Sequence, residues 1–209
     1  WSPIKFIILA FEILDNLPDD LVRPDIWWPE RATLARRALS KGMISTAYRG
    51  ASNHGLTEGA DFAEAEWLSG WISLRFLNEF DMALEHFEHM YKSVNFPISR
   101  ARGAYWAGRA KEAMGEIEAA NDWFAIASNH PTTYYGQLAY GKLYPGDNLQ
   151  PFKNPKIEIV HNDAFESHEL VQVVRMLSEI KEYELIRPFI HHLYDLNSKP
   201  AWRLWTAHL

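Results

Sequence analysis

The clearest pattern along the chain is an apolar stripe between residues 61 and 78. Its large apolar side chains recur every three or four residues, the spacing of one face of an amphipathic helix. They are Phe62, Trp67, Trp71, Leu74 and Leu77. Residues 82–94 repeat this period after a short break, and Asp81 is placed to cap their start. The two stretches predict an antiparallel helix pair.

A second pair with the same organisation follows. We expect its first helix at residues 101–114, with Ser99 as its cap, and its second at residues 118–128. Gly115 lies between them, where a glycine commonly ends a helix. The segment from 61 to 128 therefore predicts two consecutive helix pairs.

The two pairs match each other at a nearly constant separation. Ala83-x-x-x-Phe87 becomes Ala120-x-x-x-Phe124 after 37 residues, and Gly70 becomes Gly108 after 38. A small residue where the second helix crosses the first, with Ala-x-x-x-Phe in the second, resembles tetratricopeptide repeats, whose period is about 34. One pair cannot bury both of its apolar stripes, so neighbouring pairs stack. We predict an all-α superhelical array of antiparallel helix pairs, a tetratricopeptide-like α-solenoid.

The rest of the chain carries weaker forms of the same pattern. Further helices are expected at 30–40, 44–52, from Pro131 to about 143, 170–180 and 185–196, and a last one begins within 200–209. Four prolines and glycines between 144 and 163 predict an irregular connection. They are Pro145, Gly146, Pro151 and Pro155. We assign residues 1–209 to one superhelical domain, and we expect the array to continue beyond them.

Composition narrows the possible partners. A net charge of −6 and a pI near 5.8 argue against nucleic acid, which needs a concentrated basic surface. The apolar run Phe6–Phe11 is far shorter than the roughly 20 residues that cross a bilayer, so no membrane span is expected. There is no cysteine to form a disulfide or a thiolate site. The many aromatic residues, 14% of the chain, are expected to fill the contacts between helices.

Two groups of residues are candidates for chemistry. His86 and His89 lie one helical turn apart and could present two imidazoles to a metal, although a solvated helix face explains them better. Glu64 and Glu66 suggest the two carboxylates of glycoside cleavage. Residues two apart point to different faces of a helix, so a favourable place near the helix N-terminus explains these two better.

Positive charge gathers on one predicted helix of this acidic chain, and such a patch could contact the carboxylates of cell-wall peptides, although solvated surface is the simpler interpretation. Its members are Arg100, Arg102, Arg109 and Lys111. The adjacent His191 and His192 diverge on a helix. The chain contains no phosphate-binding loop, nucleophile elbow or His-Glu-x-x-His motif. We assign no catalytic, cofactor-binding or metal-ligating residue and expect no cofactor.

Several segments, in order, resemble the superhelical region of the soluble lytic murein transglycosylases. They are Asn53–Leu56, Glu64–Leu77, Pro97–Arg102, Tyr105–Ala110 and His130–Ala139. The resemblance covers roughly residues 27–143 and continues more weakly from 169 to 196. It implies a periplasmic parent enzyme, and Trp1 in place of methionine fits a processed or trimmed chain.

The same resemblance implies what the parent enzyme does. It is expected to cleave peptidoglycan between N-acetylmuramic acid and N-acetylglucosamine, leaving a 1,6-anhydromuramoyl end. In the family, one glutamate of a Glu-Ser motif acts from a lysozyme-like domain C-terminal to the helices. Here Glu166-Ser167 is the only Glu-Ser pair and lacks the segment that follows in the family, so no catalytic residue is carried over. We expect an inactive scaffold; the alternative is a tetratricopeptide-like adaptor that binds a protein partner.

Overall fold

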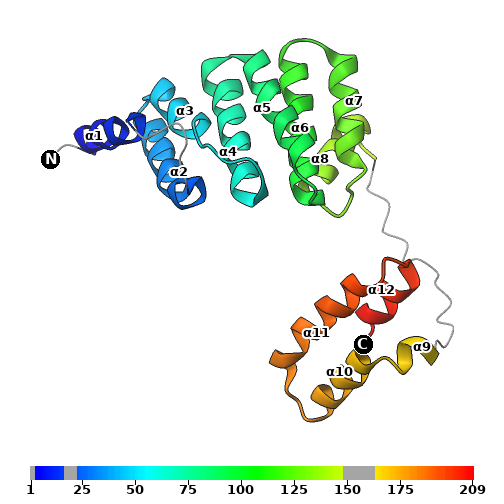
Figure 1. Ribbon diagram of the computed structural model, residues 1–209. Helices are drawn as coiled ribbons and strands as arrows, with labels where there is room; N and C mark the ends of the chain where they lie inside the picture. Colours follow the sequence, from blue (N-terminus) through cyan, green and yellow to red (C-terminus); the bar gives the residue numbers. More distant parts are fainter. Residues whose placement is uncertain (1–2, 17–22, 148–162) are drawn as a thin grey trace. The chain divides into compact units, whose positions relative to one another are not determined.

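The computed structural model describes residues 3–16, 23–147 and 163–209, and it contains no strand in these ranges (Figure 1). The prediction of an all-α fold is confirmed. The chain divides into two compact units, Trp1–Gln150 and Pro151–Leu209. The expected single array over 1–209 stays a prediction, and each unit is described by itself.

In its described residues, the first unit has eight α-helices and one π-helical turn. They are α1 (Pro3–Asp15), α2 (Pro24–Ser40), α3 (Ile44–Ser52), α4 (Gly59–Ile72), the π-helix η1 (Ser73–Leu77), α5 (Phe80–Ser93), α6 (Pro97–Ala113), α7 (Ile117–Ser128) and α8 (Tyr134–Leu143). Helix α1 was not predicted from the sequence. Its Ile7 and Phe11 are buried among residues of α2 and α3.

Each helix of the first unit packs against the next one along the chain (Figure 1). Alternate helices are also in contact, since α4 touches both α2 and α6, and α6 touches α8. The first helices of successive pairs therefore lie beside one another. That adjacency brings side chains from α4, α6 and α8 onto one surface.

Glycines let the paired helices approach closely, as the repeat predicted. A Cβ on Gly70 of α4 would lie 2.7 Å from Cε1 of Phe87 in α5. A Cβ on Gly108 of α6 would lie 2.6 Å from Cε1 of Phe124 in α7. Carbon atoms cannot approach so closely without a shift, so in each pair the phenylalanine ring occupies the space that the missing side chain leaves.

Two predicted caps are wrong. Helix α5 begins at Phe80, after Glu79, so Asp81 lies inside its first turn, where a carboxylate favours the helix dipole. Helix α6 begins at Pro97, two residues before Ser99. Proline is favourable at the first helical position because its missing N–H would have no partner there. Among the described residues, no side chain caps the start of either helix.

The start of α8 also differs from the prediction. The helix begins at Tyr134 and not at Pro131, because Thr133 caps it. Oγ1 of Thr133 accepts a hydrogen bond of 3.1 Å from the N–H of Gly136. Most of the predicted irregular connection, residues 148–162, lies outside the described residues.

The second unit has its own small core. Its helices are α9 (Asp163–Glu166), α10 (Glu169–Glu179), α11 (Tyr183–Leu196) and α12 (Pro200–Ala207). Phe165, Val171, Val174 and Leu193 are buried together. Nε1 of Trp202 donates to the carbonyl of Leu193 at 2.8 Å and ties α12 to the end of α11. Within the described part of both units, no helix is long and apolar enough to cross a membrane.

Candidate functional site: a buried glutamate among three histidines

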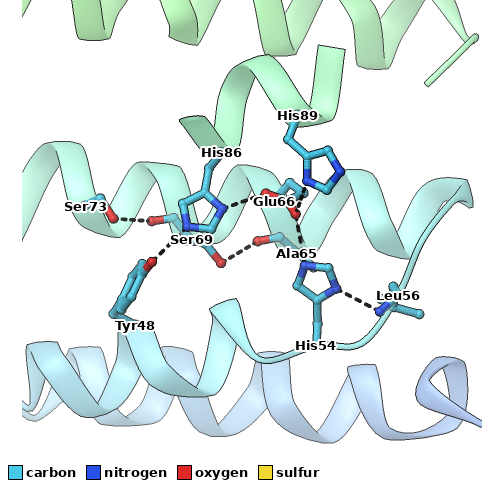
Figure 2. Close-up of polar contacts among 9 residues, drawn as sticks. All are labelled: Tyr48, His54, Leu56, Ala65, Glu66, Ser69, Ser73, His86 and His89. Carbon is cyan, nitrogen blue, oxygen red and sulfur yellow. Dashed lines mark hydrogen bonds and ion pairs between the residues drawn. The ribbon is translucent and has the colours of Figure 1, made fainter. Parts of the chain in front are cut away.

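Glu66 of α4 is 4% exposed, and three imidazoles surround its carboxylate (Figure 2). Nδ1 of His86 lies 2.6 Å from Oε2, and Nδ1 of His89 lies 2.9 Å from Oε1. Nε2 of His54 lies 3.2 Å from Oε1. His86 and His89 come from α5, and His54 comes from the connection between α3 and α4. One carboxylate thus joins three segments of the first unit.

The hydrogen bonds assign the ring protons. Nδ1 of His54 accepts from the backbone N–H of Leu56 at 3.0 Å, so the proton of the neutral ring is on Nε2 and is donated to Glu66. When Nδ1 of His86 donates to Glu66, its Nε2 is free to accept from the hydroxyl of Tyr48, 2.9 Å away. The polar chain therefore extends from α3 through α5 to α4 (Figure 2).

Aromatic neighbours hold the imidazoles in place. The His54 ring meets Trp28 and Phe62 edge-on, with centroids 6.1 and 5.9 Å apart. Phe62 also contacts His89 edge-on at 5.1 Å. Trp28 and Phe62 are both buried. Glu66 and His54 therefore lie within apolar packing, where an unpaired charge would be costly, while the His89 ring reaches the surface.

The histidines stabilise the ionised form of Glu66. Burial raises the pKa of this carboxyl and is the largest single influence. The hydrogen bonds and the electrostatic attraction of His54 and His86 act against it and together prevail, which lowers the pKa of Glu66 to about 2. Glu66 is thus an ionised acceptor at neutral pH and has no proton to give as a general acid.

Tyr48, His86 and Glu66 form a hydroxyl–imidazole–carboxylate line, an order that activates nucleophiles in many enzymes. Here the pKa of the Tyr48 phenol is raised, first by burial and then by the charges of Glu66 and Glu85. A phenol with a raised pKa stays protonated and serves as a hydrogen-bond donor. The line fits a structural tie better than a reaction centre.

His86 and His89, the sequence candidates for a metal, both turn toward Glu66. Their Nδ1 atoms are occupied by its carboxylate oxygens. Over the described ranges, no group of three or more His, Cys, Asp or Glu side chains is arranged to hold a metal ion. The structure gives these two histidines the role of partners to a buried acid.

The two carboxylates Glu64 and Glu66 point in different directions, as their spacing predicted. Glu64 is partly exposed, forms an ion pair with Arg36, and accepts from Nε1 of Trp28 at 3.3 Å. Glu66 faces the histidines. A pair of carboxylates on either side of a glycosidic bond is not formed by these residues.

The four positive residues of α6 do not act as one patch. Arg100 donates to the hydroxyl of Tyr91 at 2.7 Å, Arg109 pairs with Glu112 at 2.8 Å, and Lys111 pairs with Glu116 at 2.6 Å. Arg102 differs, because its hydrogen bond to the carbonyl of Ala63 is long, at 3.3 Å. The candidate patch therefore reduces to two guanidinium groups without an ion pair among the described residues, and Arg102 has the longer hydrogen bond of the two.

The remaining candidates lie in the second unit. His191 and His192 are exposed on α11. Glu166 ends the short helix α9 and pairs with Arg175, while the Ser167 hydroxyl donates to the carbonyl of Asp163 at 2.6 Å. Both members of the Glu-Ser pair are thus engaged in local contacts.

Sequence reasoning missed the meeting of His54 with Glu66. Periodicity places Glu66 among buried neighbours of α4, and a carboxylate there requires partners. The sequence therefore indicates that Glu66 needs hydrogen-bond partners, without naming them. His54 lies outside the helices, so only the packing of the connection between α3 and α4 could reveal which imidazole reaches it.

Comparison of the chain with models of known families, with curated proteins and with solved structures found no match.

Proposed function

We propose that the chain is the non-catalytic helical scaffold of a soluble lytic murein transglycosylase. The observation that carries the proposal is the place of the resembling segments in the first unit. Glu64–Leu77 contains Glu66 and Gly70, and Tyr105–Ala110 contains Gly108. These residues hold the helix contacts described above. A resemblance concentrated on packing residues fits a scaffold better than a catalytic domain.

The proposed form of this scaffold is a curved superhelical wall of tetratricopeptide-like pairs. It is supported by contacts between consecutive and alternate helices in the first unit, which is how stacked repeats bury their apolar stripes. The recurrence of a glycine beneath a phenylalanine in α4–α5 and α6–α7 adds support, because it makes the two pairs alike in their crossing.

In the proposed parent enzyme, a lysozyme-like domain C-terminal to these helices cleaves peptidoglycan and forms the 1,6-anhydromuramoyl end. The scaffold meets peptidoglycan through that enzyme, positions its catalytic domain and limits how a glycan strand approaches. The proposed location is the periplasm, where the substrate lies. No residue between 1 and 209 is assigned a catalytic role.

Zymography in gels containing murein tests this proposal. The full-length parent is expected to clear murein, and residues 1–209 alone are expected to leave it intact. Clearing by residues 1–209 would contradict the scaffold role. A parent that contains no lysozyme-like Glu-Ser domain and clears nothing would contradict the family assignment.

A tetratricopeptide-like adaptor is the second candidate, and one pocket favours it. Side chains at the start of α4 and between α5 and α6 enclose about 480 Å³, with Phe96 and Ile98 exposed at its rim. Exposed apolar side chains beside a pocket are typical of protein contacts. The coding sequence after residue 209 separates the candidates, since an adaptor ends there or continues with repeats.

A further inference from the structure

Six aromatic rings form a continuous strip across η1, α4, α6 and α8. Phe76 contacts Trp71 at 5.2 Å between centroids, Trp71 stacks on Trp67 at 5.9 Å, Trp67 meets Trp106 at 6.2 Å, Trp106 meets Tyr135 at 6.5 Å, and Tyr135 meets Tyr134 at 5.2 Å. The strip runs from η1 and α4 over α6 to α8. We call it the aromatic strip.

The strip is open at both ends and partly open between them. Phe76 is 42% exposed and Tyr134 is 69% exposed, while the four inner rings keep part of their surface accessible. The π-helical turn η1 places Phe76 at the end of the row of rings, because it brings this residue beside Trp71, five residues earlier. Trp67 and Trp71 are stacked, and the other neighbours in the row meet edge to face. The part of each ring that stays accessible offers apolar surface to a ligand.

Arg102 lies on the strip without an ionic partner. Its guanidinium is 5.3 Å from the centroid of Trp67, and no carboxylate in the described ranges forms an ion pair with it. Glu64, the carboxylate whose charge acts on it, is engaged by Arg36 and Trp28. Burial lowers the pKa of Arg102, which is the effect of removing a charge from water.

Hydrogen-bond donors also remain unused at this place. Nε of Arg102 and Nε1 of Trp67 and Trp106 are shielded from solvent and have no acceptor among the described residues. Buried donors usually have partners, and a buried cation usually has a counter-ion. Within the described residues, these three donors therefore have no protein partner beside the rings of the strip.

We propose that the aromatic strip and Arg102 bind a carboxylate-bearing glycan, with sugar rings stacked on the strip and a carboxylate held by Arg102. The apolar faces of sugar rings can stack on the accessible ring faces of the strip, and a guanidinium gives a carboxylate charge-assisted hydrogen bonds. The choice of peptidoglycan as the glycan to test rests on the proposed function.

Two tetrasaccharides isolate the role of the carboxylate. One alternates N-acetylglucosamine with N-acetylmuramic acid, and the other is chitotetraose, which lacks the lactyl ether and its carboxylate. Titration of residues 1–209, followed by tryptophan fluorescence and calorimetry, is expected to show tighter binding of the first. Equal binding of the two sugars, or binding of neither, would overturn the proposal. Tighter binding of an acidic Glu-Ala tetrapeptide would also overturn it and would favour the adaptor.

Arg102→Met is expected to weaken binding of the muramic tetrasaccharide by about 10-fold to 100-fold, the effect of losing a hydrogen bond to a charged group. Binding of chitotetraose is expected to stay the same. Arg100→Met is the matched control, since Arg100 lies on the same helix and over an aromatic ring, but is already bonded to Tyr91. Unchanged binding in Arg102→Met, or an equal loss in Arg100→Met, would refute the role of Arg102.

Stability measurements test whether these losses are caused by unfolding. Arg102→Met is expected to resist urea at least as well as the native chain, because it removes a desolvated charge without an ionic partner. Tyr134→Ala, at the exposed end of the strip, is expected to weaken both sugars by a similar factor. If the parent clears murein while residues 1–209 bind no glycan, this inference fails and the scaffold proposal stands.

Discussion

At the scale of single residues, the Glu66 carboxylate links α4 to α5 and to the connection between α3 and α4. Its carboxylate is almost fully buried and accepts from His54, His86 and His89. A buried carboxylate without donors would be very costly, and the shielded donors of His54 and His86 would be costly without a carboxylate, whereas His89 reaches solvent. Glu66, His54 and His86 therefore stabilise the fold together.

Glu66→Gln is expected to lower the free energy of unfolding by about 3 kcal/mol at pH 7, because the amide group brings its own N–H donors against the imidazole donors. Urea denaturation measures this loss. Glu64→Gln is the matched control on the same helix, and its partly exposed ion pair with Arg36 should cost about 1 kcal/mol or less. Equal losses in the two variants would contradict the role given to Glu66.

The loss should also depend on pH. In the folded chain the pKa of Glu66 is about 2, below its ordinary value of 4.5. A lowered folded pKa contributes stability above the unfolded value, and this contribution disappears as the pH falls toward the folded value. The difference between the native chain and Glu66→Gln should therefore shrink as the pH falls from 4.5 to about 2. A difference that stays constant over this range would show that the carboxylate charge is not responsible.

At the scale of elements, the glycine crossings set how closely paired helices pack. Gly70 lies under Phe87 and Gly108 under Phe124, and the second crossing is tighter because the carbonyl of Ala120 would also lie 3.1 Å from a Cβ on Gly108. An aromatic ring can shift a little, whereas the helix backbone resists a shift. The crossings thus fix the distance between the helices.

Gly70→Ala and Gly108→Ala are each expected to destabilise the chain by about 1–3 kcal/mol through overpacking, with the larger loss at Gly108. Gly141→Ala is the control, because α8 has open space there, and alanine should stabilise the helix by about 0.5–1 kcal/mol. Thermal or urea unfolding of the three variants measures these effects. Stabilisation by Gly108→Ala would contradict the close crossing.

Element boundaries were less predictable than the elements themselves. Periodicity predicts the helices α4, α5, α6 and α7. The buried surface of α4 differs from its predicted stripe, because Glu66 and Ser69 are buried and Trp67 and Trp71 are partly accessible. The ends depend on single contacts, such as Pro97 at the first position of α6 and the Thr133 cap of α8. Helix α1 was not predicted because its apolar run, Phe6–Phe11, has no polar residues between the apolar ones and therefore shows no helical period.

At the scale of the whole molecule, charge limits the partners of the chain. A net charge of −6 repels phosphates, and three of the four basic side chains of α6 are engaged by nearby residues. Positive charge is therefore not available as a continuous surface on that helix.

Residues 1–209 are expected not to bind a DNA duplex of about 20 base pairs at about 150 mM salt, with any dissociation constant weaker than about 100 μM. Fluorescence anisotropy of labelled DNA measures this, with a basic DNA-binding domain as the positive control. Micromolar binding that falls steeply with added salt would contradict the expectation and would reveal a basic surface that the net charge conceals.

The sequence by itself determined that the chain is helical, that consecutive helices pair, and that Gly70 and Gly108 lie where Phe87 and Phe124 cross. These properties repeat along the chain, and a period can be read without coordinates. Only the tertiary structure decided that His54 joins His86 and His89 at Glu66, and that Arg102, among the four basic residues of its helix, is left without a strong partner in the described part of the chain. Such contacts join residues from different elements, and the free energy of a buried charge depends on which partners the packing brings within hydrogen-bond distance.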